Sequence, residues 1–331
     1  MGRGTVLVRA PNHLGDLLMS LPAQHLLASS LPEGGCTLGV LAPHFPLLSR
    51  LSPLPVCSLP PDSTGRVRLF RSLEARAALV LAPSFRGALE VFFARIPVRV
   101  GVRWDLRENR LTHRRQIHHP RLPFDVHISD LYVELSQLLL ESLGYFPPET
   151  APSPSTPRRS PRPTSTPVVV VHPGSLGSPQ TRRWPLVHFR QVVEGLLQRG
   201  CRVQVVGGRE EGPLGKQLAL GLESEVEVLA GASALDLVAL LALMEEAHVF
   251  VGNDSGPAHL AAVVGLPSVV IYTSTSPHLT GPRGPGLRMW RELTCSACYA
   301  PTCSVGLLCH DLSVDEVLAR LDELLWPELS P

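Results

Sequence analysis

A proline-rich segment near the middle of the sequence limits how this chain can fold. Residues 147–167, PPETAPSPSTPRRSPRPTSTP, contain eight prolines among many Ser and Thr residues. Proline lacks the N–H group that a helix interior or a central strand needs, so this segment can form neither. We expect an extended linker there. It would join two domains, residues 1–146 and 168–331, and a chain of 331 residues is long enough for two cores.

The second half alternates short apolar runs with segments of helical spacing. The spacing predicts strands within 167–175, 201–208, 226–231, 248–252 and 267–274, and helices within 184–200, 212–222, 233–247 and 256–265. Regular alternation of apolar strands with helices is typical of a parallel sheet that is covered on both faces.

The first half repeats this pattern. We expect strands at 5–10, 36–42 and 77–83, one helix over 16–31 that contains Pro22, and a terminal helix over 127–144. The fold class is therefore α/β, with two Rossmann-like, doubly wound domains that face each other across a cleft. Ligands bind at such clefts. A final helix at about 313–326 could cross back onto the first domain.

Composition excludes several classes of protein. The net charge is +1, which gives no general attraction to nucleic acid or membrane. Seven cysteines in a long chain do not suit a secreted disulfide scaffold. The sequence shows neither a signal peptide nor an apolar run of membrane-spanning length. We expect a soluble cytoplasmic protein with reduced thiols.

In each half, one glycine-containing loop follows the first strand. In the first, Gly15 permits close approach of a ligand, and Asp16 either complements a helix dipole or takes part in chemistry. The second, 172–185, combines glycines, hydroxyl groups and two arginines, which suit phosphate oxygens or form a solvated loop. Neither loop has the G-x-G-x-x-G dinucleotide fingerprint.

Two further strand ends carry acidic residues. In VVGGREEG (205–212), Glu210 and Glu211 could accept hydrogen bonds from ribose hydroxyls or form an acid pair at a helix start. In HVFVGNDSGPAHL (248–260), Ser255 or Gly256 could cap the next helix, whose N-terminus can bind an anion. The simpler interpretation is a capped corner with a solvated Asp254.

Four cysteines lie close together in the sequence near the C-terminus. They have the spacing C-x2-C-x4-C-x5-C and comprise Cys295, Cys298, Cys303 and Cys309. Four thiols could hold a structural zinc ion, but the spacing is not that of two paired C-x2-C units. The alternatives are four reduced thiols in a turn-rich loop or a redox-sensitive cluster.

A basic belt spans residues 95–121. It holds eight arginines and three histidines against two acids. A solvated face is the usual interpretation of such a run. The excess of arginine also suits a multiply anionic partner, and no nucleic-acid recognition motif accompanies it.

Several motifs resemble one family in order and spacing. They are PNHLGDLLMSLPA, HPGS…RRWP…HF, VVGGREE and VGNDSGPAHLAAVVGLPSVVIYTSTSP. The chain resembles glycosyltransferase family 9, the ADP-heptose:lipopolysaccharide heptosyltransferases, over nearly its whole length except the linker. RAPNHLGD, LAPSFRGALEVFFARIPVRVGVR and the CSACY…C…C loop look most like the heptosyltransferase II branch.

The resemblance implies the GT-B fold and an inverting transfer of L-glycero-D-manno-heptose from ADP-heptose to the lipopolysaccharide inner core. It implies that the second heptose is added and that catalysis needs no metal cofactor. The acceptor would bind the N-terminal domain and the nucleotide-sugar the C-terminal one. The lipid A–core acceptor would bring this cytoplasmic protein into peripheral contact with the inner membrane surface.

The resemblance also assigns roles to residues. Asp16 matches the general base, and Arg182 stands where the family usually has the Lys of a K-x-W-P pattern. Other positions match the donor site: Ser175, Glu210 or Glu211, Asn253, Asp254, Ser255, Gly256 and His259. We expect acceptor contacts from Asn12 and Gly15 and from three arginines of the belt, Arg103, Arg107 and Arg110.

Three alternatives remain at the level of sequence. A related family 9 transferase could use another nucleotide-sugar or acceptor. A two-lobed small-molecule binding protein would share the architecture without catalysis. A nicotinamide oxidoreductase fits least, because neither half carries the glycine fingerprint.

Overall fold

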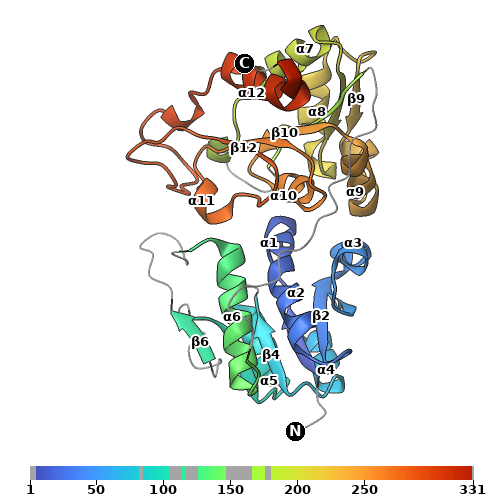
Figure 1. Cartoon of the computed structure of the whole chain (residues 1–331), viewed down its shortest axis with the longest axis vertical. Coiled ribbons are helices and arrows are strands. Elements are labelled where there is room, and N and C mark those ends of the chain that lie inside the picture. The colour runs from blue at the N-terminus through green and yellow to red at the C-terminus, as the bar shows by residue number, and fades with distance from the viewer. Residues whose placement is uncertain are drawn as a thin grey trace. The chain divides into compact units, whose positions relative to one another are not determined.

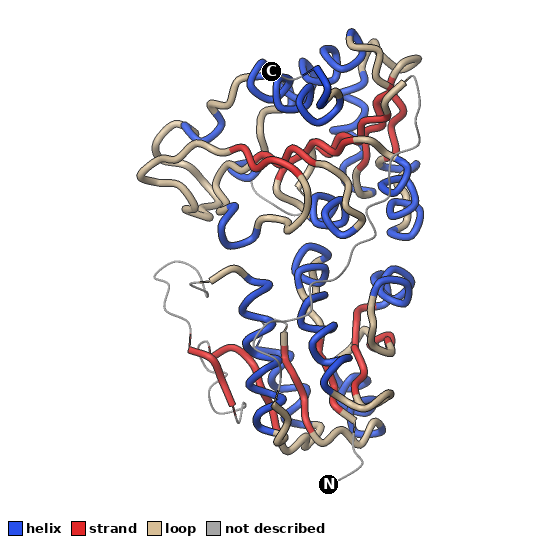
Figure 2. The backbone as a smooth tube through the Cα atoms, viewed as in Figure 1, coloured by secondary structure: helices blue, strands red, loops and turns tan. Residues whose placement is uncertain are grey.

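The computed structural model describes residues 5–81, 85–103, 113–116, 126–146, 166–175 and 180–329. The chain divides into two compact units, residues 1–155 and 156–331. Each unit is an α/β domain built on one sheet (Figures 1 and 2). Most of the expected linker, residues 147–165, lies outside the described part of the chain.

The N-terminal unit has a six-stranded parallel sheet in the order β3-β2-β1-β4-β5-β6. The order reverses between β1 and β4, which is the switch point of a doubly wound fold. Its strands are β1 Val6–Arg9, β2 Cys36–Leu41, β3 Val56–Leu59, β4 Ala77–Val80, β5 Val98–Arg103 and β6 His113–Gln116.

Helices of the N-terminal unit cover the sheet in two groups. Helices α2 and α6 pack against each other, while α4 and α5 pack together over a core centred on Phe70 (Figure 1). The helices are α1 Leu14–Met19, α2 Leu21–Ser30, α3 Phe45–Leu51, α4 Ser63–Ser72, α5 Phe85–Phe93 and α6 Ile128–Ser142.

The prediction of one helix over residues 16–31 is wrong. The structure has two helices, because α1 ends at Met19 and α2 starts at Leu21 with Pro22 in its first turn. Proline has no N–H to donate to the preceding turn, and its ring crowds that turn's carbonyl. Ser20 stabilises the junction: its Oγ donates to the Leu17 carbonyl (2.6 Å) and accepts from Gln24 Nε2 (2.8 Å).

The C-terminal unit repeats the topology. Its six parallel strands have the order β12-β11-β10-β7-β8-β9, with the switch point between β7 and β10. The strands are β7 Val168–His172, β8 Arg202–Val206, β9 Val226–Leu229, β10 Val249–Asn253, β11 Ser268–Ile271 and β12 Gly286–Met289. The helices are α7 Leu186–Gln198, α8 Gly212–Ala219, α9 Leu237–Glu246, α10 Gly256–Val263, α11 Pro277–Thr280 and α12 Val314–Leu325.

The final helix, α12, belongs to the core of the C-terminal unit. It packs beside α7, and its buried residues Val317, Leu318 and Leu321 join the apolar cluster that includes Trp184. A capping box of Ser313 and Glu316 starts the helix. The sequence analysis allowed this helix to cross back onto the first domain, whereas the structure packs its apolar face on the second sheet, because Val317, Leu318 and Leu321 complete the apolar core there.

Candidate active site

The switch point of the C-terminal unit brings two sequence motifs together. Strands β7 and β10 are neighbours, with Gly252 paired to His172, so both end at the same edge of the sheet. The residues after β7 and the residues after β10 therefore share one surface. Open α/β sheets bind ligands at the carboxyl edge of such a switch point.

His172 connects these loops, although the sequence analysis gave it no role. Its side chain is buried, with Nδ1 3.0 Å from Ser255 Oγ and Nε2 3.3 Å from Glu211 Oε2. An ionised carboxylate can only accept, so Nε2 carries a proton and donates to Glu211. A histidine that ends an otherwise apolar strand just before Pro-Gly was the available signal.

Glu211, rather than Glu210, reaches the site. Glu210 is exposed, whereas Glu211 is buried and its Oε2 accepts a hydrogen bond from the Gly208 N–H (2.8 Å). Burial alone would raise the pKa of Glu211, but the hydrogen bond and charge of His172, the Gly208 N–H and Arg183 together lower it.

The other carboxylate oxygen of Glu211 lies directly over Gly174. A Cβ atom at Gly174 would stand 1.9 Å from Glu211 Oε1, so only glycine fits there. Among the described residues, no hydrogen-bond donor reaches this buried oxygen. A buried acceptor of this kind suits a hydroxyl group of a ligand.

Asn253 holds the site together from within. It is fully buried; its Oδ1 accepts from the Trp184 N–H (2.9 Å), and its Nδ2 donates to the Pro173 carbonyl (2.8 Å). Both ends of the amide thus bind the backbone of neighbouring loops. The geometry gives Asn253 a supporting position beneath the expected donor site.

Asp254 and Arg182 form a partly buried ion pair. Arg182 Nη2 lies 3.8 Å from Asp254 Oδ2, and the Arg182 side chain is one-third exposed (33%). Asp254 is therefore paired with a cation, so its negative charge would not face a bound anion without compensation.

The neighbouring Thr181 is held by two hydrogen bonds. Its Oγ1 donates to the Ala300 carbonyl (2.8 Å), and its own carbonyl accepts from Thr273 Oγ1 (2.8 Å).

Helix α10 starts at this edge, as the sequence predicts. Ser255 occupies the N-cap position in extended conformation. Its hydroxyl makes no capping hydrogen bond to this helix and contacts His172 instead. Gly256 and Pro257 form the first turn, and His259 follows on the buried face. The amides of this turn and the helix dipole favour an anion.

A run of buried hydroxyl groups after β11 was not predicted. Residues Tyr272, Thr273, Ser274, Thr275 and Ser276 are all at most 5% exposed. Tyr272 Oη and Ser274 Oγ have no hydrogen-bond partner among the described residues. Strand β11 lies beside β10, so these hydroxyls extend the same polar edge.

The cysteine loop borders this edge. Its Tyr299 Oη accepts from the Ser276 N–H (3.1 Å). Burial and the charges of the other three cysteines raise the pKa of Cys309, while backbone N–H groups led by Leu307 lower that of Cys303. In the described part of the chain, no three metal-binding side chains lie close enough together to hold an ion.

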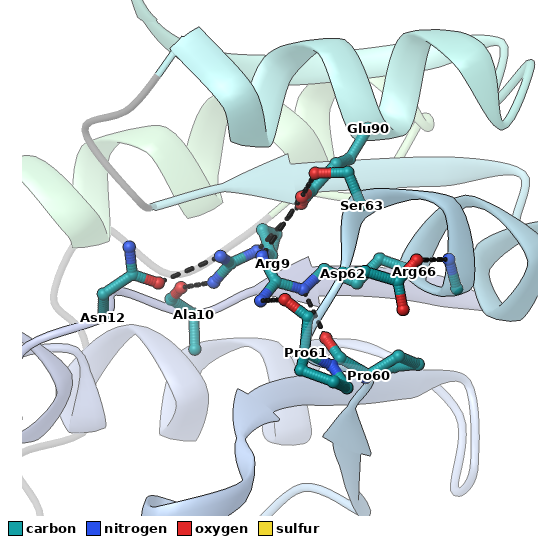
Figure 3. A network of polar contacts seen from close by, with 10 residues as sticks. Arg9, Ala10, Asn12, Pro60, Pro61, Asp62, Ser63, Arg66 and Glu90 are labelled. Atoms are coloured by element: carbon teal, nitrogen blue, oxygen red, sulfur yellow. Dashed lines mark hydrogen bonds and ion pairs between the residues drawn. The ribbon is translucent and has the colours of Figure 1, made fainter.

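In the N-terminal unit, the loop after β1 carries the expected base. Asp16 lies in the first turn of α1 and Gly15 precedes it. Burial raises the pKa of Tyr132 on α6 far above its usual value, and the negative charge of Asp16 raises it further. Asn12 is exposed in the same loop and is held by Arg9 (Figure 3).

The belt falls largely outside the described residues. Arg107 and Arg110 lie outside them, and Arg103 ends β5 with an undescribed side chain. Gly177 and Ser178 of the second glycine loop also lie outside, whereas Ser175 is buried and its carbonyl accepts from Arg183 Nη2 (3.3 Å).

None of the described helices has the length and apolarity that crossing a bilayer requires.

Two doubly wound α/β units, the second with a polar switch-point edge, are the architecture of GT-B glycosyltransferases. The structure of E. coli ADP-heptose lipopolysaccharide heptosyltransferase II has this fold, with a TM-score of 0.79 and 24% identity over 98% of this chain and 100% of that one. E. coli heptosyltransferase WaaC with ADP matches with a TM-score of 0.68 and 20% identity over 96% and 99%.

A family model for glycosyltransferase family 9 (heptosyltransferase) matches residues 66–308, and the chain belongs to this family. Lipopolysaccharide heptosyltransferase 2 of Salmonella typhimurium is 29% identical over 87% of this chain and 88% of its own length. Lipooligosaccharide heptosyltransferase 2 of Haemophilus influenzae is 28% identical over 84% and 85%. The chain is a glycosyltransferase, so the binding-protein and oxidoreductase alternatives no longer apply.

Proposed function

We propose that this chain transfers L-glycero-D-manno-heptose from ADP-heptose to the inner core of lipopolysaccharide, as the second heptose and with inversion at the anomeric carbon. Relatives named heptosyltransferase 2 support the choice of step. The observation that carries the proposal is the switch-point site of the C-terminal unit. There a cation, a helix start and a buried carboxylate oxygen with no hydrogen-bond partner among the described residues share one edge.

The donor would use each part of that edge. The amides at the start of α10 and the guanidinium of Arg182 suit the two phosphates, with Ser175, Ser255 and His259 beside them. Glu211 Oε1 would accept a hydrogen bond from a ribose hydroxyl. Asp254 would keep the Arg182 fork turned toward the phosphates.

The reaction is a single displacement. Asp16 would take the proton from an acceptor hydroxyl while that oxygen bonds to the anomeric carbon of heptose. The bond from that carbon to the phosphate oxygen breaks on the opposite face, and ADP leaves with the electron pair. Arg182 and the α10 amides would stabilise the charge that develops on the diphosphate.

Thermal shift with ADP, UDP and NAD tests the donor assignment. ADP should raise the unfolding midpoint, because a ligand that binds only the folded state stabilises it. UDP and NAD should raise it far less at equal concentration. Stabilisation by UDP alone would overturn the ADP-heptose assignment and favour a related transferase.

The lipid-linked acceptor would place the chain at the cytoplasmic face of the inner membrane as a peripheral protein. Co-sedimentation with vesicles that contain lipid A–core should exceed that with vesicles of phosphatidylcholine alone. Equal sedimentation with both would contradict this localisation.

A structural zinc ion at Cys295, Cys298, Cys303 and Cys309 stays a prediction, and these thiols would have to approach one another to bind it. The loop also supports the segment that carries Arg182, through Thr181 and Ala300. Metal analysis of the purified protein decides the question. One zinc per chain supports the site, and a trace amount contradicts it.

A further inference from the structure

A buried ionic network lies beneath the loop that leads to Asp16. Arg9 at the end of β1, Glu90 on α5 and Arg66 on α4 are each at most 6% exposed (Figure 3). Arg9 Nε lies 3.5 Å from Glu90 Oε2, and Arg66 Nη1 lies 3.1 Å from Glu90 Oε1. Two cations thus share one carboxylate, and burying three charged groups together costs desolvation free energy.

The two arginines of this network also donate hydrogen bonds to loop residues. Arg66 donates to the carbonyls of Pro60 (2.7 Å) and Pro61 (3.0 Å), which follow β3. Arg9 donates to the Ala10 carbonyl and to Asn12 Oδ1 (2.9 Å), which follow β1. Both loops lie at the carboxyl edge of the sheet, and the loop after β1 is the one that carries the expected acceptor residues Asn12 and Gly15.

Arg9 also decides which way the Asn12 amide faces. A guanidinium has five donors and no acceptor, so only the amide oxygen of Asn12 can meet it. The NH2 group is thereby turned away from Arg9, as Figure 3 shows, and Asn12 itself is exposed. The backbone carbonyl of Asn12 is held as well, because His44 Nε2 donates to it (2.9 Å).

We propose that Arg9 is a positioning residue that presents the Asn12 NH2 group as a fixed hydrogen-bond donor to an oxygen of the saccharide acceptor. The inference rests on the proposed function and adds a contact that selects acceptors bearing a hydroxyl or carboxylate oxygen at that point. Glu90 holds the guanidinium in place through their ion pair. A lysine could keep the ion pair but could not also hold the Ala10 carbonyl and Asn12.

Steady-state kinetics of four variants tests this role: N12A, R9K, the double variant R9K/N12A, and R66K. If Arg9 acts through Asn12, N12A should raise the acceptor KM about tenfold with the donor KM unchanged, since one hydrogen bond is worth about that factor. R9K should also raise the acceptor KM. The double variant should be no worse than N12A, because effects within one network do not add.

R66K is the matched control, because Arg66 pairs with the same carboxylate without touching Asn12. It should lower the thermal midpoint like R9K and leave the acceptor KM near that of the unsubstituted chain. Equal rises of KM in R9K and R66K, or multiplied effects in the double variant, would overturn the inference. N12A changes only an exposed side chain, so it remains informative even if R9K fails to fold. An unsubstituted chain without transfer activity would refute the function itself.

Discussion

At the scale of single residues, the site depends on buried polar groups whose partners are sequence-distant. Glu211 and Ser255 both meet His172, although 39 and 83 residues separate them from it. The sequence indicated the acid and the serine through their places after strands. It marked the histidine only as a polar residue at the end of an apolar strand, which does not show with which groups the side chain pairs.

Substituting Asp16 by Asn should abolish most of the transfer. The amide cannot take the acceptor proton, so kcat should fall by about 10²–10⁴-fold. Asp62→Asn is the control variant, because the Asp62 carboxylate caps α4 by accepting from the Gly65 N–H, and Asn caps helices equally well. Rates measured with ADP-heptose should be low for Asp16→Asn and normal for Asp62→Asn. An Asp16→Asn protein with normal kcat would remove Asp16 as the base.

Glu211→Gln should weaken ADP binding about tenfold, whereas the same change at the exposed Glu210 should have little effect. Titration calorimetry with ADP measures both. Equal affinities in the two variants would contradict the contact with ribose.

The pH dependence of stability provides a second measure of Glu211. Its pKa is lowered in the folded chain, so its stabilising contribution is complete above the unfolded pKa and is lost as pH falls through the folded value. The difference in unfolding free energy between the unsubstituted chain and Glu211→Gln should therefore narrow as pH falls below about 4.5. Denaturant unfolding at several pH values measures it. A difference that widens toward acid would contradict the assignment.

At the scale of elements, continuous apolar runs predicted strands, whereas short strands and strands with charged residues were missed. Strand β7 (VVVVH) and strand β10 (VFVGN) follow directly from their sequence. The strands that were not predicted are β3 (VCSL), β5 (VRVGVR), β6 (HRRQ) and β12 (GLRM). The helices predicted in the second half and at 127–144 lie within a few residues of those observed, whereas α3, α4, α5 and the short α11 were not predicted. The single helix predicted over 16–31 is two helices, because helical spacing continues across Pro22 while the backbone hydrogen bonds do not.

The short element that carries Arg182 offers a test at this scale. Thr181→Val removes the hydroxyl that donates to Ala300 and keeps the shape of the side chain, so it should loosen Arg182. We expect ADP affinity to fall severalfold and unfolding free energy to fall by about 1 kcal/mol. Calorimetry and thermal denaturation measure these effects. Thr181→Ser keeps the hydroxyl and is the matched comparison, and indistinguishable variants would show that the bond does not matter.

At the scale of the molecule, one topology is used twice. The switch points lie between β1 and β4 and between β7 and β10. Motif order and apolar alternation predicted both sheets. They did not predict the Arg9–Glu90–Arg66 network, because its three members lie 24 or more residues apart and each alone suggests an exposed charge. The family motifs indicated the switch-point edge of the second sheet as the expected donor site, while the contacts of Asn253 and His172 at that edge required coordinates.

The central claim is heptose transfer to a core that already carries one heptose. The most direct measurement offers ADP-heptose with acceptors bearing zero, one or two heptoses and reads the products by mass. The account predicts extension of the one-heptose acceptor by a single heptose, with release of ADP and no extension of the other two. Extension of the zero-heptose acceptor alone, or of none, would contradict it.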